Sequence, residues 1–241
     1  MANLVHSLNR AGARLRQVHV TLEGGGLRTE AGALHFLKGE IEMESSAGGP
    51  SGLAKKMASA VLSGESVFKP TYRGHGEVFL EPSFGHFILL RVENEEMIAD
   101  KGIYYCSDVG LEVGAVRNSD LAARLAGGEG WFQTRIAGRG LCVLHSPVPP
   151  AELKHYRLNN ETLRVDGNFA VLRKGLIDFT VEKSSRSLFG SISSGEGLLQ
   201  TFRGTGEVWL APTQSVYAWL QARAEQQLAQ ALALLKSGAN R

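Results

Sequence analysis

The sequence has little of several features that mark common protein classes. Only two of its 241 residues are cysteine, and Cys106 and Cys142 form neither a CxxC pair nor a disulfide framework. The first residues include charged and polar side chains where a signal peptide needs an apolar stretch, and no run approaches the ~18 apolar residues of a membrane span. These absences argue against a disulfide-stapled secreted domain and predict a cytoplasmic protein without a transmembrane segment.

The sequence also lacks a marked excess of positive or negative charge. The net charge is +2, and lysine and arginine are scattered along the chain, so no basic patch for nucleic acid stands out. The seven histidines show no HxH or HExxH spacing, which leaves a metal site without support. With 43% hydrophobic residues the chain is too apolar for disorder, so we expect a globular protein without a cofactor.

Glycine is abundant, and it follows a repeat. It fills 29 positions, and a Gly-x-Gly pair starts at residues 74, 138 and 204, each time after an upstream Gly-Glu. The segment TYRGHGEVFL at 71–80 returns as TFRGTGEVWL at 201–210, with a fainter copy between them. The repeat predicts three β modules over residues 15–92, 93–157 and 158–220, followed by a helix over 221–238.

Most of the repeated glycines are predicted to serve as structural turns. Acidic-plus-glycine turns open each module, a second glycine turn follows, and the Gly-x-Gly pair marks a tight connection or bulge entering a strand. A nucleotide-binding loop needs strand, GxGxxG and helix, whereas here a strand follows. The predicted turn glycines are Gly32, Gly39, Gly74, Gly76, Gly102, Gly110, Gly138, Gly140, Gly167, Gly175, Gly204 and Gly206.

The strand after each glycine pair is apolar on both faces. Val78 and Leu80 point to one side and Phe79 to the other, and Val208, Leu210 and Trp209 repeat this pattern. We therefore expect one face to pack inside its module and the other against a neighbouring module or subunit.

Apolar residues also fall in three variable loops and in the C-terminal segment. The loops are predicted either to cover the module cores or to form a contact surface for a partner protein or a membrane. The apolar residues of the C-terminal segment recur at helical spacing and form a stripe, which is predicted to dock on the protein's own sheets or on another subunit. Gly238 is predicted to end this helix. The candidate contact residues of the loops are Leu53, Met57, Leu121, Leu125, Leu188 and Phe189, and the helical stripe comprises Ala224, Leu228, Ala231, Leu232 and Leu235.

The three ordered modules, with Val-Trp-Leu after the last glycine pair and Asp166-Gly167 opening the third, resemble the altered-inheritance-of-mitochondria-24 family over about residues 15–215. The resemblance implies an all-β fold of three repeated modules like the tryptophan RNA-binding attenuation protein (TRAP), described as β-sandwich or double-stranded β-helix units, with a C-terminal α-helix added here. It also implies ring-shaped homotrimers. Bacterial members have no established activity, mitochondrial relatives are linked to inner-membrane organisation, and the family supplies no catalytic residues.

The sequence shows no pattern typical of a catalytic site. Cys142 aligns with the inward Val78, and His145 falls on the opposite face of its strand, so a nucleophile and base pair is not expected. Arg73 and Arg203 each precede a glutamate by four residues, which predicts ion pairs with Glu77 and Glu207. The recurring Glu65, Glu129 and Glu196 are interpreted as structural.

We expect a non-catalytic oligomeric scaffold or binding protein, since the chain is repetitive and lacks a catalytic constellation. Two alternatives remain open at this point: a ring that binds nucleic acid or a small ligand, by analogy of fold, and an organiser that associates with a membrane surface through the apolar loops.

Overall fold

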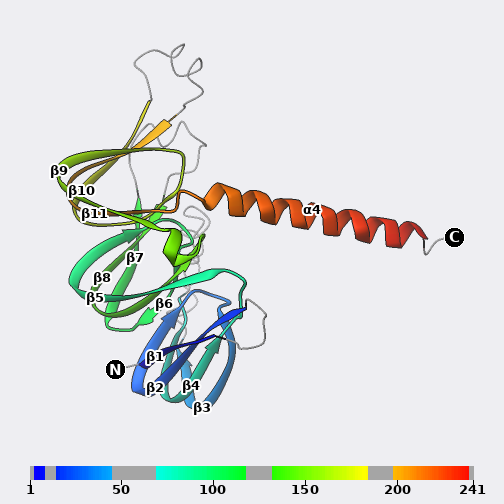
Figure 1. Cartoon of the computed structure of the whole chain (residues 1–241). Helices are drawn as coiled ribbons and strands as arrows, with labels where there is room; N and C mark the ends of the chain where they lie inside the picture. Colours follow the sequence, from blue (N-terminus) through cyan, green and yellow to red (C-terminus); the bar gives the residue numbers. More distant parts are fainter. Residues whose placement is uncertain (1–2, 9–14, 45–68, 118–131, 184–197, 239–241) are drawn as a thin grey trace, which may run out of the picture.

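The computed structural model describes residues 3–8, 15–44, 69–117, 132–183 and 198–238. Within these ranges the chain forms a series of antiparallel strands followed by one long C-terminal α-helix. Figure 1 shows the strands stacked in three groups, with the helix projecting from one side. The elements are β1 (Asn3–Leu8), β2 (Arg16–Thr29), β3 (Leu34–Glu44), β4 (Thr71–Leu80), β5 (His86–Ala99), β6 (Tyr104–Asp108), β7 (Leu111–Arg117), β8 (Phe132–Ser146), η1 (Pro150–Glu152), β9 (Lys154–Asp166), β10 (Ala170–Lys183), β11 (Leu198–Leu210) and α4 (Gln214–Gly238).

The strands fall into three sets with the same pairing. In the first set β4 lies between β2 and β3, in the second β8 lies between β5 and the β6–β7 pair, and in the third β11 lies between β9 and β10. Short ladders join the sets: 27–29 of β2 pair with β6, and 97–99 of β5 pair with β10. The resulting sheet order starts at β3 and ends at β9.

Local details repeat as well as the pairing. The second strand of each set is bulged at its start, and a residue at the end of the third strand, or just after it, donates a backbone hydrogen bond to the residue before the second strand. These bonds run from Glu81 to Ala33 at 2.8 Å, from His145 to Ile103 at 2.6 Å and from Ala211 to Phe169 at 2.7 Å.

The predicted turn glycines take two different places. Gly32, Gly102 and Gly167 lie in the turn before the second strand of each set, with φ of 80°, 76° and 94°. Gly39 and Gly175 were predicted at turns but lie inside β3 and β10, so that prediction was wrong. Gly110 lies in the turn between β6 and β7, as predicted. The Gly-x-Gly pairs were predicted at tight connections entering a strand but lie inside strands, so that assignment was wrong as well; they are Gly74, Gly76, Gly138, Gly140, Gly204 and Gly206 of β4, β8 and β11.

Close backbone approach explains the glycines inside the strands. Gly39 pairs with Gly76, and Gly175 pairs with Gly206. A Cβ atom on Gly76 would lie 2.2 Å from the carbonyl oxygen of Lys38, far inside van der Waals contact. Any side chain there would force the two strands apart. The high glycine content therefore reflects close contacts between paired strands more than turns.

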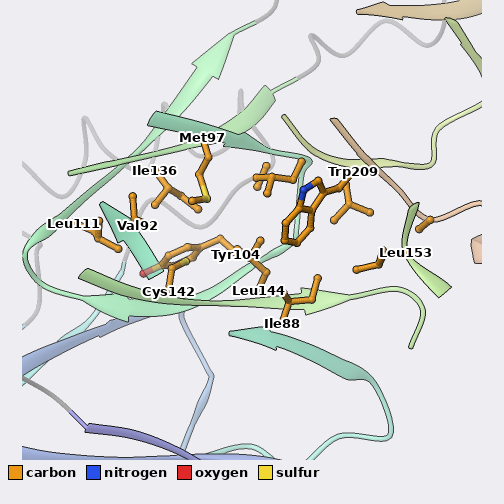
Figure 2. Packing of buried hydrophobic residues seen from close by; sticks show 14 of the residues in the cluster. Ile88, Val92, Met97, Tyr104, Leu111, Ile136, Cys142, Leu144, Leu153 and Trp209 are labelled. Atoms are coloured by element: carbon orange, nitrogen blue, oxygen red, sulfur yellow. The ribbon is translucent and has the colours of Figure 1, made fainter. Parts of the chain in front are cut away.

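Hydrophobic clusters fill the interior, and two of them combine neighbouring sets. Phe87, Cys106 and Val143 of the second set complete the cluster of the first. Trp209 and its third-set neighbours complete the cluster of the second, and Figure 2 shows the indole reaching in among the labelled residues of that cluster. The third cluster contains third-set residues alone: Leu158, Val165, Phe202, Val208 and Leu210.

The C-terminal helix begins earlier than predicted and does not dock on the sheets. It starts at Gln214 rather than residue 221, and it extends away from the strands along most of its length (Figure 1). Large apolar side chains along it are exposed: Val216, Trp219, Leu220, Leu228 and Leu232. The stripe was predicted to dock on the protein's own sheets or on another subunit; its described side chains do not pack on the sheets, and docking on another subunit stays a prediction.

Candidate functional site

The two cysteines lie in cores rather than in a reactive site. Cys106 and Cys142 are both 0% exposed, and Cys142 occupies the interior position that its alignment with Val78 predicts. Burial raises the pKa of Cys142 to about 12 and that of Cys106 well above its ordinary value. Both thiols are therefore protonated at neutral pH and cannot act as thiolate nucleophiles.

His145 is held among rings. Its centroid lies 5.5 Å from that of Phe87 and 6.4 Å from that of Tyr105, and burial lowers its pKa. These contacts give His145 a packing role beside the junction of the first two sets. In the ranges that the structure covers, no group of three or more His, Cys, Asp or Glu side chains is placed to hold a metal ion.

The predicted ion pairs connect different partners. The guanidinium of Arg73 lies 3.2 Å from Glu44, and that of Arg203 lies 2.8 Å from Glu182, rather than beside Glu77 and Glu207. The prediction was wrong because four residues along a strand span about 13 Å, whereas residues on the adjacent strand lie within reach.

Glu77 and Glu207 instead contact basic side chains on adjacent strands. Glu77 lies 2.9 Å from the Lys38 ammonium and 3.0 Å from His19 Nε2. Glu207 lies 3.5 Å from the Lys174 ammonium, at the equivalent place in the third set. The two outer sets therefore carry the same carboxylate and lysine pair on their second and third strands.

An aromatic end surface forms on the first set, made of His19, His35, Phe36 and Phe79. Phe79 stacks between His19, 4.1 Å away, and Phe36, 4.2 Å away, and the ring of His35 meets Phe36 edge-on. Phe36 remains 48% exposed. This surface comes from β2, β3 and β4 at the first end of the sheet order, where the described residues place no further strand.

Positions equivalent to this aromatic end surface are covered in the other sets. Phe36 lies directly opposite Phe79 on the paired strands β3 and β4. The same place is taken by Cys106 opposite Val143 in the second set and by Leu172 opposite Trp209 in the third. Those four residues are between 0% and 9% exposed and belong to the core of the preceding set. Among the residues that the structure describes no set precedes the first, which leaves its aromatic face open there.

The opposite end of the sheet is open too. β9 is the last strand in the order, and its residues 163–165 are equivalent to the segments of β2 and β5 that pair with a following set. Phe169 and Phe179 pack against the third cluster but remain partly exposed. Within the described strands the third set thus has a free edge beside a core that no following set completes.

An open groove of roughly 480 Å³ lies where the second and third sets meet. Lys174 crosses it, with its ammonium 3.5 Å from Glu95 and 3.5 Å from Glu207. Because the lysine charge is compensated by these carboxylates, the groove presents balanced charges rather than a site for an ion of one sign.

The root of α4 is fastened by Glu152 of η1, the short helix between β8 and β9. Its carboxylate accepts hydrogen bonds from Thr213 Oγ1 at 2.5 Å and Tyr217 Oη at 2.6 Å, and these bonds hold the pKa of Glu152 below its ordinary value. The exposed part of the helix beyond Tyr217 therefore projects from a defined base. Within the described ranges no helix is long and apolar enough to cross a membrane.

Several site residues were missed or remain untested. The candidate loop residues Leu53, Met57, Leu121, Leu125, Leu188 and Phe189 lie outside the described residues, as do Glu65, Glu129 and Glu196. Sequence reasoning missed Phe36 and His19. Comparing the second strands of the repeats could have drawn attention to Phe36, because its place is held by Cys106 and Leu172 in the other copies.

Known proteins resemble this chain over most of its length. An uncharacterised protein of Streptococcus pyogenes serotype M6 is 24% identical over 201 residues, which is 80% of this chain and 79% of the relative. A crystal structure of a protein from Streptococcus pyogenes superposes with a TM-score of 0.66 at 21% identity, covering 87% of this chain and 93% of the other. At that identity the likeness concerns the fold alone.

The family model described as Mitochondrial biogenesis AIM24 matches residues 9–213, which takes in all three strand sets. Its span ends just where α4 begins. The chain therefore belongs to the AIM24 family, as the repeated glycine pattern predicted.

Proposed function

We propose that this protein is a non-catalytic scaffold that works as a homo-oligomer, with a trimer as the expected state. In this proposal the strand sets are three TRAP-like modules, and copies of the chain join through the ends of their sheets. The observation that carries the proposal is the exposed aromatic end surface, whose equivalent positions in the second and third sets are buried by a neighbour.

The energetic argument follows from this equivalence. Inside the chain, the same contact joins the first set to the second and the second set to the third. The first set keeps one side of this contact exposed, and the third set keeps the other side exposed. Covering an exposed aromatic face such as that of Phe36 and Phe79 removes apolar surface from water at roughly 25 cal/mol per Å². A contact that joins unlike ends of identical chains closes into a ring when the rotation between copies permits it.

Other features fit a scaffold. The two thiols are buried and protonated, so neither offers a thiolate nucleophile, and two free buried cysteines suit the reducing cytoplasm in which we place the protein. The projecting helix would give each copy an apolar stripe, with Leu228 and Leu232 exposed, for holding a partner protein.

Light scattering coupled to size exclusion tests the proposal. We expect a mass near three times the 26.0 kDa of one chain at micromolar concentration. A variant with Leu228→Glu and Leu232→Glu on the exposed helix should keep that mass, because the proposed contact lies in the sheets. A mass of one chain for the wild-type protein at micromolar concentration would refute the scaffold assembly.

A further inference from the structure

We propose that β9 of one copy pairs antiparallel with β3 of a second copy, placing Leu163, Arg164 and Val165 opposite the second copy's Lys38, Leu37 and Phe36. This inference rests on the proposed homo-oligomer and specifies the contact. Both strands lie at the ends of the sheet order, so each presents an edge for the same kind of ladder.

The register comes from the two ladders inside the chain. Thr29, Arg28 and Leu27 face Cys106, Ser107 and Asp108 in the first ladder. Ala99, Ile98 and Met97 face Leu172, Arg173 and Lys174 in the second. If the third set of one copy meets the first set of a second copy in the same register, the equivalent pairs are Val165 with Phe36, Arg164 with Leu37 and Leu163 with Lys38.

A backbone hydrogen bond supports the same register. The amide of Glu30 donates to the carbonyl of Tyr105 at 2.9 Å, and the amide of Asp100 donates to the carbonyl of Val171 at 2.9 Å. Each accepting residue lies at the bulge that starts the second strand of its set. The equivalent bond would run from the Asp166 amide to the carbonyl of His35, which lies at the same bulge in β3.

Charge and packing are complementary in this arrangement. Lys174 lies 3.5 Å from Glu95 across the contact between the second and third sets. The equivalent residues at the proposed contact are Lys38, whose side chain is 77% exposed, and Glu161 of the other copy. Phe36 and Phe79 would then close the third cluster as Leu172 and Trp209 close the second.

Disulfide trapping tests the register. Directly opposed residues of antiparallel strands bring their Cβ atoms within disulfide reach, and a slip of one residue turns the side chains to opposite faces. We expect oxidation of a mixture of Arg164→Cys and Leu37→Cys proteins to give a covalent dimer that neither protein gives alone. The matched control mixes Arg164→Cys with Lys38→Cys, which should cross-link at least tenfold less. Cys106 and Cys142 are fully buried and should not contribute.

Hydrogen exchange on the unmodified protein gives a second readout that does not depend on the variants. The amide of Asp166 should be protected in the oligomer and should exchange at least tenfold faster after dilution to monomer. A wild-type monomer would defeat the proposed function together with this inference. An oligomer in which only the slipped pair cross-links, or in which Asp166 exchanges freely, would overturn the register and leave the scaffold proposal standing.

Discussion

The rings of Phe36 on β3 and Phe79 on β4 stack with their centroids 4.2 Å apart, and Phe36 is 48% exposed. A stacked aromatic pair normally lies in a core or an interface, because exposure to water forfeits the free energy of burying it. The pair is therefore the first place to test whether copies of this chain associate.

Replacing Phe36 with aspartate should weaken self-association by roughly thirtyfold or more, as expected for an anchor residue of an interface. The side chain is already 48% exposed, so the fold of the monomer should survive. Sedimentation velocity across a concentration series measures the effect. Phe84→Asp is the matched control, since Phe84 is 74% exposed outside the aromatic end surface, and its assembly should equal that of the wild type.

Gly76→Ala should lower the free energy of unfolding by roughly 2–4 kcal/mol. Gly76 has a φ of 151°, and its added Cβ would press on the Lys38 carbonyl oxygen at 2.2 Å. Gly114→Ala is the comparison, because no heavy atom lies within 4 Å of the added Cβ there. Urea unfolding of both variants measures the difference. Equal stability of the two would show that β3 and β4 can separate freely, contrary to the close approach described above.

Glu152→Ala should release the root of α4. The substitution removes the acceptor for Thr213 and Tyr217, so amide exchange over residues 214–220 should accelerate by at least fivefold while the strands are unaffected. Glu225→Ala, farther along the exposed helix, should leave exchange at the root unchanged.

Acid should have the same effect on the helix root in the wild-type protein. The pKa of Glu152 is lowered in the fold, so its contribution to stability is present above its ordinary value of 4.5 and is lost as the pH falls through the folded-state value. Amide NMR shifts of residues 214–220 should move in that range. An unchanged helix root at pH 3 would contradict the anchoring role.

His145 should make stability depend on pH near neutrality. Burial lowers its pKa below the ordinary 6.5, so the unfolded chain takes up a proton first and the free energy of unfolding falls as the pH drops below 6.5. The slope from one such group is at most about 1.4 kcal/mol per pH unit. His145→Phe should reduce the slope between pH 6.5 and 5 without abolishing it, because burial also lowers the pKa of His86. Between pH 7 and 8 the two proteins should show equal slopes, and an unaltered slope at acid pH would rule out this contribution.

The repeat made much of the fold predictable. Alternation in 78–80 and 208–210 placed Val78, Leu80 and Val208 inside their cores, where all three are 0% exposed. It also predicted that the opposite face would pack against a neighbour, as Trp209 does. These predictions succeeded because side-chain direction alternates along any strand, whatever its partner.

Contacts across strands were beyond the same reasoning. Arg73 pairs with Glu44 rather than Glu77, and Gly39 lies in a strand opposite Gly76 rather than at a turn. Register decides both, and register depends on how distant segments align. A left-handed residue recurs in the first strand of each set, at Gly24, Asn94 and Asn160, and it escaped notice because the residue type changes between copies.

The sequence by itself determined that the protein is β-rich, that its pattern occurs three times and that a helix follows, because periodicity and glycine spacing are local properties of the chain. The tertiary structure alone decided which glutamate each arginine meets and that Trp209 completes the core of the second set. It also decided that the face around Phe36 stays open, because the burial of a residue depends on which neighbour packs against it and not on its own chemistry.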